Sequence, residues 1–118
     1  MGISQFAARI VTLTACTLGS STFPPPAHAG DVFMLGENLY KTCVKDPTFC
    51  QGYVSGVADV MFGTEVSILN SQACPQPGTT IGDVSATTVE WMEKNPKRLG
   101  YTAYSVVAVA LAESFPCK

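Results

Sequence analysis

Four cysteines, unevenly spaced over residues 43–117, constrain this chain more than any other feature of its sequence. A small domain buries too little of its surface to be very stable on core packing alone. An even number of cysteines in a short exported chain is typical of a disulfide framework, whereas zinc sites use closer cysteine pairs or histidines. We therefore expect two disulfides and no metal site among Cys43, Cys50, Cys74 and Cys117.

The first 29 residues predict export of the chain. Residues 10–18 form an apolar run too short to span a bilayer, and Ala27-His28-Ala29 fits a signal-peptidase site. Cleavage after Ala29 would release residues 30–118 into the periplasm as a single helical domain. The alternative is a lipoprotein motif ending at Cys16, which would leave the same domain tethered to a membrane.

Apolar residues recur at helical spacing through most of residues 30–118. The pattern predicts helices over residues 30–43, 48–69, 80–95 and 97–114, and the last is expected to be the most buried. We expect Asp31 to cap the first helix, and Thr80 with Asp83 to form a capping box on the third. Asn95 and Pro96 are expected to end the third helix and begin the fourth. Short connections favour an all-α, disulfide-stabilised, four-helix up-and-down bundle.

This topology makes a prediction about the cysteine pairing. Cys43 and Cys50 end the first helix and begin the second, so they share one end of the bundle. Cys74 and Cys117 follow the second and fourth helices, so they share the other end. Pairing Cys43 with Cys50 and Cys74 with Cys117 therefore avoids bridging the length of the bundle.

Two glycines, Gly52 and Gly56, lie four residues apart within the second predicted helix. Glycine inside a helix costs about 0.5 to 1 kcal/mol relative to alanine, so two of them suggest a packing reason. We expect a neighbouring helix to approach closely there. The alternative is that they only weaken the helix.

Composition argues against catalysis and nucleic-acid binding. The only histidine, His28, leaves with the signal peptide, which excludes Ser-His-Asp and Cys-His sites and removes the usual general base. Asp59 is expected to be a hydrogen-bonded structural carboxylate. Residues 30–118 carry six Lys or Arg and nine Asp or Glu, so no basic patch is expected for a phosphate backbone. We expect no enzyme activity and no cofactor, and hence a binding module.

Aromatic residues are divided between core and surface in this prediction. Trp91 and Tyr53 lie on apolar stripes and are expected to be in the core. Tyr101 and Tyr104, early in the fourth predicted helix, are equally compatible with a core and with an interface.

The segment from Cys50 to Asp59, CQGYVSGVAD, resembles the C-x-G-Y-[IV]-x-G-V-x-D signature of the Rap/Tai immunity proteins. Three further pieces occur in the order of that family: Cys74-Pro75 before a Gly78-Thr79 turn, Lys94-Asn95-Pro96, and Ala110-Leu111 leading to Phe115-Pro116-Cys117. The resemblance covers residues 43–117. It implies that the signature residues serve mainly the fold; they are Gly52, Tyr53, Gly56, Asp59, Asn95 and Pro96.

The resemblance also implies a function and a partner. Proteins of this family protect bacteria from secreted peptidoglycan amidases of type VI secretion, which they bind and occlude in the periplasm, often as homodimers. Two loops are candidates for the contact with the amidase. The first consists of Asp46, Pro47, Thr48 and Phe49, and the second of Pro75, Gln76, Pro77 and Gly78. The alternative is a periplasmic stress chaperone or general binding protein resembling HdeA, although the number of carboxylates is ordinary for such a chaperone.

Overall fold

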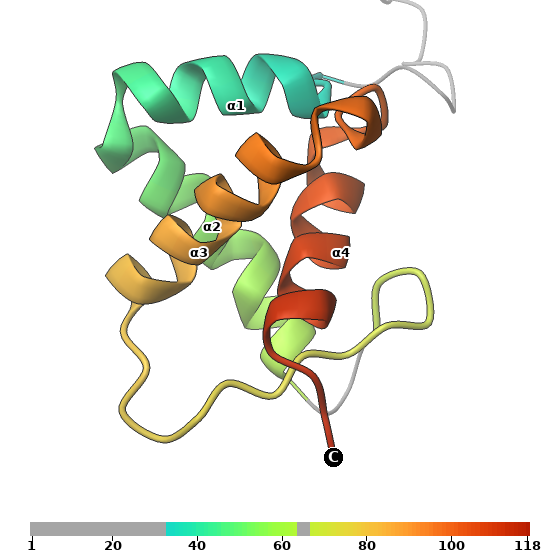
Figure 1. The fold of residues 1–118 in the computed structure, drawn as a ribbon. Coiled ribbons are helices and arrows are strands. Elements are labelled where there is room, and N and C mark those ends of the chain that lie inside the picture. Colours follow the sequence, from blue (N-terminus) through green and yellow to red (C-terminus); the bar gives the residue numbers. More distant parts are fainter. Residues whose placement is uncertain (1–32, 64–66) are drawn as a thin grey trace, which may run out of the picture.

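The computed structural model describes residues 33–63 and 67–118, and within them the protein is a small all-helical bundle (Figure 1). The helices are α1 (Gly36–Lys45), α2 (Pro47–Phe62), α3 (Ile81–Lys94) and α4 (Ala103–Ser114), with a 3₁₀ turn, η1 (Pro96–Arg98), between the last two. Extended pairing in these residues is limited to two isolated bridges. The predicted all-α, four-helix, disulfide-stabilised fold is confirmed. The predicted signal peptide, its cleavage site and Cys16 lie outside the described residues.

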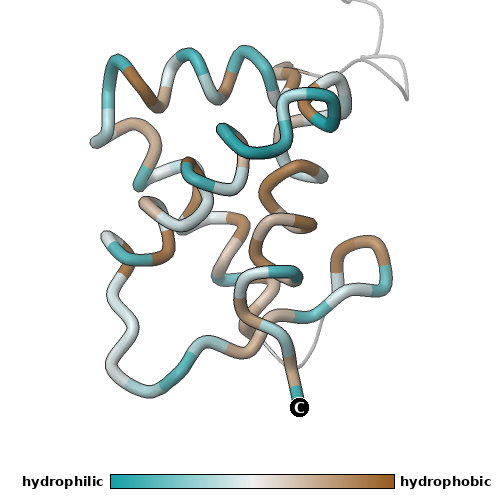
Figure 2. The backbone as a smooth tube through the Cα atoms, viewed as in Figure 1, coloured by the Kyte–Doolittle hydropathy of each residue, from teal (hydrophilic) through white to brown (hydrophobic). Residues whose placement is uncertain are grey.

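Helix α4 is the centre of the core, as predicted. Six of its 12 residues are buried, and it packs against α1, α2 and α3. Figure 2 shows its apolar residues continuing through the middle of the molecule, while α1 presents alternating polar and apolar positions. None of the helices in residues 33–63 and 67–118 has both the length and the apolar character needed to cross a membrane. The largest fully buried side chains are Leu39, Cys50, Val54, Met61, Thr88, Met92, Val107 and Leu111.

Helix α1 begins at Gly36 rather than at residue 30, because the segment before α4 supplies its cap. The amide of Gly36 donates to the carbonyl of Tyr101 at 2.8 Å, and that of Glu37 donates to Leu99 at 2.9 Å. These bonds satisfy amides that otherwise need a side-chain acceptor at a helix start. The predicted cap, Asp31, lies outside the described residues. In Figure 1, α1 starts beside the beginning of α4 and runs away from it, crosswise to the direction of α4.

The close approach between helices occurs at Gly36 and not at Gly52 or Gly56, so that prediction was wrong. A Cβ atom built on Gly36 would lie 2.6 Å from Val106 Cγ2 and 2.8 Å from the carbonyl oxygen of Leu99. A Cβ atom on Gly52 or Gly56 would meet nothing within 4 Å. The reason is that α2 packs inward along a different stripe. That stripe consists of Cys50, Val54, Val57, Ala58 and Met61.

Helix α2 ends at Phe62 rather than at residue 69. Its C-cap, Gly63, is extended and does not continue the helical conformation. Farther along, Ile68 packs against the core from a turn, in which the amide of Ser71 donates to the Ile68 carbonyl at 2.9 Å. The helical spacing of Ile68 in the sequence is therefore coincidental.

The predicted capping box begins α3. The hydroxyl oxygen of Thr80 accepts from the amide of Asp83 at 3.2 Å, and the Thr80 amide donates to the Asp83 carboxylate at 3.0 Å. Asn95 ends α3, as predicted, but its side chain does not cap the next helix: Nδ2 donates back to the Trp91 carbonyl at 2.8 Å. Pro96 accordingly begins η1, and α4 starts later than the predicted residue 97.

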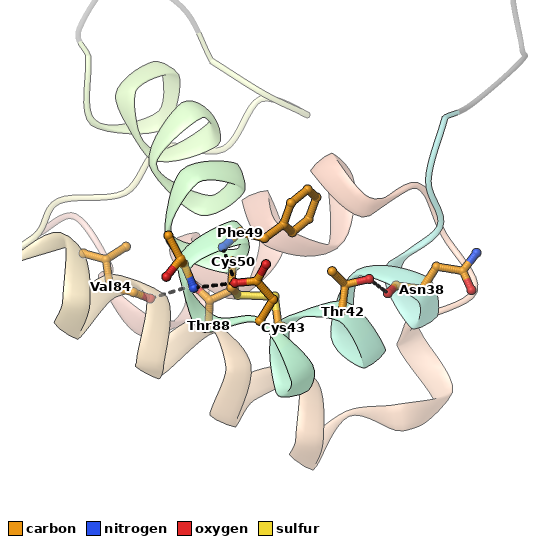
Figure 3. Close-up of a disulfide and its surroundings, with 9 residues drawn as sticks. Asn38, Thr42, Cys43, Phe49, Cys50, Val84 and Thr88 are labelled. Atoms are coloured by element: carbon orange, nitrogen blue, oxygen red, sulfur yellow. Dashed lines mark hydrogen bonds between the residues drawn. A yellow bond between two sulfur atoms is a disulfide. The ribbon is translucent and has the colours of Figure 1, made fainter.

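Both disulfides have the predicted pairing. Cys43–Cys50 joins the end of α1 to the beginning of α2, with a Cα–Cα distance of 4.7 Å, and both cysteines are buried. Figure 3 shows this disulfide lying against α3 beside Thr88, whose buried hydroxyl donates to the Val84 carbonyl at 2.8 Å. Cys74–Cys117 is exposed and holds the C-terminus against the segment that follows α2, with a Cα–Cα distance of 4.9 Å.

Candidate functional site

The signature segment on α2 has an inward and an outward side. Gly52, Gly56 and Asp59 are exposed, so none of them fills the core. Tyr53 is half-buried, its ring stacks on the exposed ring of Phe49 with 6.3 Å between centroids, and burial raises the pKa of its phenol. These signature residues therefore contribute to a surface as well as to the fold. We define the outer face of α2 as Phe49, Gly52, Tyr53, Gly56 and Val60.

The first predicted contact loop is a helix cap. The carboxylate of Asp46 accepts hydrogen bonds from the amides of Thr48 and Phe49, both at 3.0 Å, and Pro47 is the first residue of α2. All four residues are exposed. These two hydrogen bonds fix Asp46 against the first turn of α2, and such preorganisation suits a contact surface.

The second predicted contact loop connects the exposed disulfide to α3. Gln76, Pro77 and Gly78 are exposed, and Pro75 is half-buried. The Thr79 amide donates to the Gln76 carbonyl at 3.1 Å, and Gly78 has a φ of 89°, which glycine adopts without steric cost.

A shallow cavity of about 380 Å³ lies beside the buried disulfide, between α2 and α3. Pro47 of the first predicted loop lines it, but residues 75–78 do not, so the structure does not join the two loops in one cavity. Glu90 and Glu93 of α3 give this cavity an acidic side.

A larger groove, of about 490 Å³, lies on another part of the surface, and the sequence did not predict it. We call it the Trp91 groove. Trp91 of α3 is half-buried in its wall, although the sequence placed this ring in the core. Tyr101, which the sequence left open, is 70% exposed and also lines the groove. The other lining residues are Leu69, Lys97, Arg98, Ser105, Val106 and Val109.

One carboxylate fixes the wall of this groove. Glu113 of α4 accepts a hydrogen bond from Trp91 Nε1 at 2.8 Å and another from Arg98 Nη1 at 2.9 Å. The Arg98 guanidinium also lies over the indole ring, 4.7 Å from its centroid, in a cation–π contact. Three elements, α3, η1 and α4, are thereby held together at the groove. The hydrogen bond from Trp91, and to a smaller extent the one from Arg98, holds the pKa of Glu113 below its ordinary value of 4.5.

This cluster predicts a pH titration of the indole, which is the only tryptophan in the chain. A carboxyl whose pKa is lowered by folding stabilises the fold above its ordinary pKa, and the stabilisation is lost as pH falls through the lowered value. We expect tryptophan fluorescence to change with a midpoint below pH 4.5. Glu113→Gln should abolish this transition. Glu90→Gln should retain it, since Glu90 pairs with Lys94 instead. A wild-type midpoint at or above 4.5 would show that the cluster does not form.

Metal binding has no support in the part of the chain that the structure describes. No three His, Cys, Asp or Glu side chains gather there in a way that could hold a metal ion. All four of the predicted disulfide cysteines are paired.

Comparison with known proteins relates the chain to a described family. The family model of the Rap1a immunity proteins matches residues 35–117, which span all four helices and both disulfides. No curated protein and no solved structure matches the chain.

Proposed function

The chain belongs to the Rap1a immunity protein family, and from this premise we propose that it binds and occludes a secreted peptidoglycan amidase in the periplasm. Membership makes it an immunity protein, whose partner is a toxic effector protein. The match over residues 35–117 is the observation that carries the proposal, because it covers the whole folded domain. The resemblance of residues 50–59 to the Rap/Tai signature supports an amidase of type VI secretion as the effector.

Inhibition by occlusion, without catalysis, is part of this proposal. The chain has a single histidine, at position 28 in the predicted signal peptide, so a histidine base is not expected in the exported protein. A binding protein needs only a surface that covers the effector's active site. The loops at residues 46–49 and 75–78 remain predicted contacts.

The periplasm is proposed as the compartment. Residues 1–29 have the pattern of a cleavable leader, and two disulfides suit an oxidising environment. We also propose a homodimer through the outer face of α2, on which the apolar side chains of Phe49 and Val60 are 40% and 37% exposed. Light scattering should then give twice the mass of one chain for the free protein, and a mass of one chain would contradict the dimer.

A protection assay in cells tests the function and the compartment together. We expect a reading frame beside this gene to encode a secreted amidase. Directed to the periplasm, that amidase should arrest growth, and co-expression of the full chain should restore it. A chain lacking residues 2–29 should not protect, because it stays in the cytoplasm. A catalytically inactive amidase serves as the control for expression. Growth arrest that the full chain does not relieve would contradict the proposed function.

A further inference from the structure

Folding of a single chain does not explain why large side chains of the Trp91 groove are left exposed to solvent. Tyr101 is 70% exposed and Leu69 is 57% exposed. Scattered exposed apolar side chains are ordinary, but these two line one concave surface together with the half-buried ring of Trp91. Concave sites lined mainly by apolar and aromatic groups, with a few polar ones, are typical binding sites.

The backbone at Leu69 is held in an unfavourable conformation. Leu69 and Asn70 have φ values of 55° and 57°, in a two-residue turn closed by the hydrogen bond between Ser71 and Ile68. Such turns favour asparagine and glycine, whereas the Cβ of a leucine crowds the following carbonyl. Figure 2 shows the tip of this turn as apolar, standing away from the helices. The turn therefore keeps a strained leucine in solvent where it lines the groove, and strain of this kind is a reason to look for function.

The charged side chains that line the groove, Lys97 and Arg98, are both basic, although the chain as a whole has nine Asp or Glu and seven Lys or Arg. The adjacent carboxylate of Glu113 is already paired with Arg98 and Trp91, so Lys97 leaves the groove with a net positive charge. Arg98 uses one nitrogen on Glu113 and retains further N–H donors. In the described parts of the chain, Lys97 makes no ion pair. The cavity beside the buried disulfide differs, because Glu90 and Glu93 line it.

We infer that the Trp91 groove binds an acidic, partly apolar peptide segment on the surface of the effector. A carboxylate of that segment lies against Lys97 and Arg98, and an adjacent apolar side chain contacts Tyr101 and Leu69. Carboxylates pair strongly with guanidinium groups, and tryptophan, tyrosine and arginine are the residues that dominate binding energy at protein interfaces. The inference rests on the proposed function, and it identifies the surface through which that function is performed.

The single tryptophan provides a direct test of location. Protein purified after export and labelled with 5-fluorotryptophan carries one ¹⁹F signal, from position 91. Adding an unlabelled, catalytically inactive form of the amidase expected beside this gene should shift that signal, and the shift should saturate at the stoichiometry of the complex. If calorimetry shows binding and the signal does not move, the groove is not the contact surface.

Matched variants test the charge and the apolar contact separately. Lys97→Glu and Tyr101→Ser should each weaken amidase binding at least tenfold, and Lys97→Glu should reduce the salt dependence of the dissociation constant. Lys41→Glu and Tyr104→Ser are the controls, because both residues are exposed and neither lines the groove. The controls should stay within twofold of wild type. Circular dichroism would verify that all four variants remain folded.

The outcomes separate this inference from the proposed function. Groove variants that bind as wild type, while Thr48→Arg or Gln76→Arg weakens binding, would overturn the groove and favour the predicted loops. Wild-type protein that does not bind the amidase at micromolar concentrations would overturn both proposals. A soluble, acidic peptidoglycan stem peptide that binds the wild type and not Lys97→Glu would assign the groove to a cell-wall fragment, and so contradict a protein segment as its ligand.

Discussion

Replacing both Cys74 and Cys117 by serine is expected to lower the free energy of unfolding by about 4 kcal/mol. The disulfide spans a sequence separation of 43 residues, so its loss releases a long loop in the unfolded chain. Both cysteines are exposed, so serine leaves no cavity and buries no hydroxyl. Small domains have total stabilities of about 5 to 15 kcal/mol, so this single change should leave the protein marginally stable. Urea unfolding followed by circular dichroism measures the effect.

Other contacts at the same place are too weak to replace the disulfide. The Cys74 amide donates to the Phe115 carbonyl at 2.7 Å, and the rings of Phe62 and Phe115 meet edge to face at 6.2 Å. A hydrogen bond of this type contributes about 1 kcal/mol, and so does an aromatic pair. In the serine variant, the free energy of unfolding should also depend more steeply on urea concentration, because the unfolded chain without the disulfide is less compact. A decrease in the free energy of unfolding of less than about 1 kcal/mol would mean that the Cys74–Cys117 disulfide does not constrain the unfolded state.

The second large effect is expected at Gly36. Gly36→Ala should lower the free energy of unfolding by about 1 to 3 kcal/mol, because the new methyl group overlaps Val106 and the backbone of Leu99. The carbonyl of Leu99 cannot move freely, since it accepts the bond from Glu37 that caps α1. Urea unfolding measures the effect. Repeating it at several protein concentrations separates the stability of the single chain from any stability gained by dimer formation.

The two glycines of α2 are the matched controls. Within one chain, an alanine Cβ at Gly52 or Gly56 lies in open space, so each substitution should raise the stability of the monomer by about 0.5 to 1 kcal/mol through helix propensity. Unfolding at several protein concentrations separates this gain from any effect on the proposed dimer, which uses the same face. The three substitutions are chemically identical, and only their surroundings differ. If Gly36→Ala were as stable as wild type, the contact between the start of α1 and α4 would be wrong.

Features that depend on neighbouring residues were predictable from the sequence. The Thr80–Asp83 capping box is such a feature, because its two residues lie within one helical turn and need nothing else. The cysteine pairing was predictable for a related reason: it requires only the helix ends, and errors of several residues in those ends do not change which cysteines meet. The boundary errors at α1 and α2 therefore left the pairing correct.

Features that depend on distant segments were not predictable. Periodicity places Gly52 and Gly56 on one side of α2, but it does not say whether that side meets another helix. The start of α1 is capped by carbonyls from residues 99 and 101, far along the chain. The Trp91 groove combines Leu69, Trp91 and Tyr101 from three separate segments, and its wall depends on Glu113, 22 residues beyond Trp91. Only a three-dimensional structure shows that these residues are neighbours.

The central claim is that this protein is an immunity protein that blocks a peptidoglycan amidase by occlusion. Its most direct test is the rate at which the amidase expected beside this gene cleaves purified peptidoglycan, titrated with the exported protein. The rate should fall linearly to background and reach it when all the amidase is in the complex, with no cleavage of either protein. An unchanged rate in the presence of a micromolar excess of the folded, disulfide-bonded protein would contradict it.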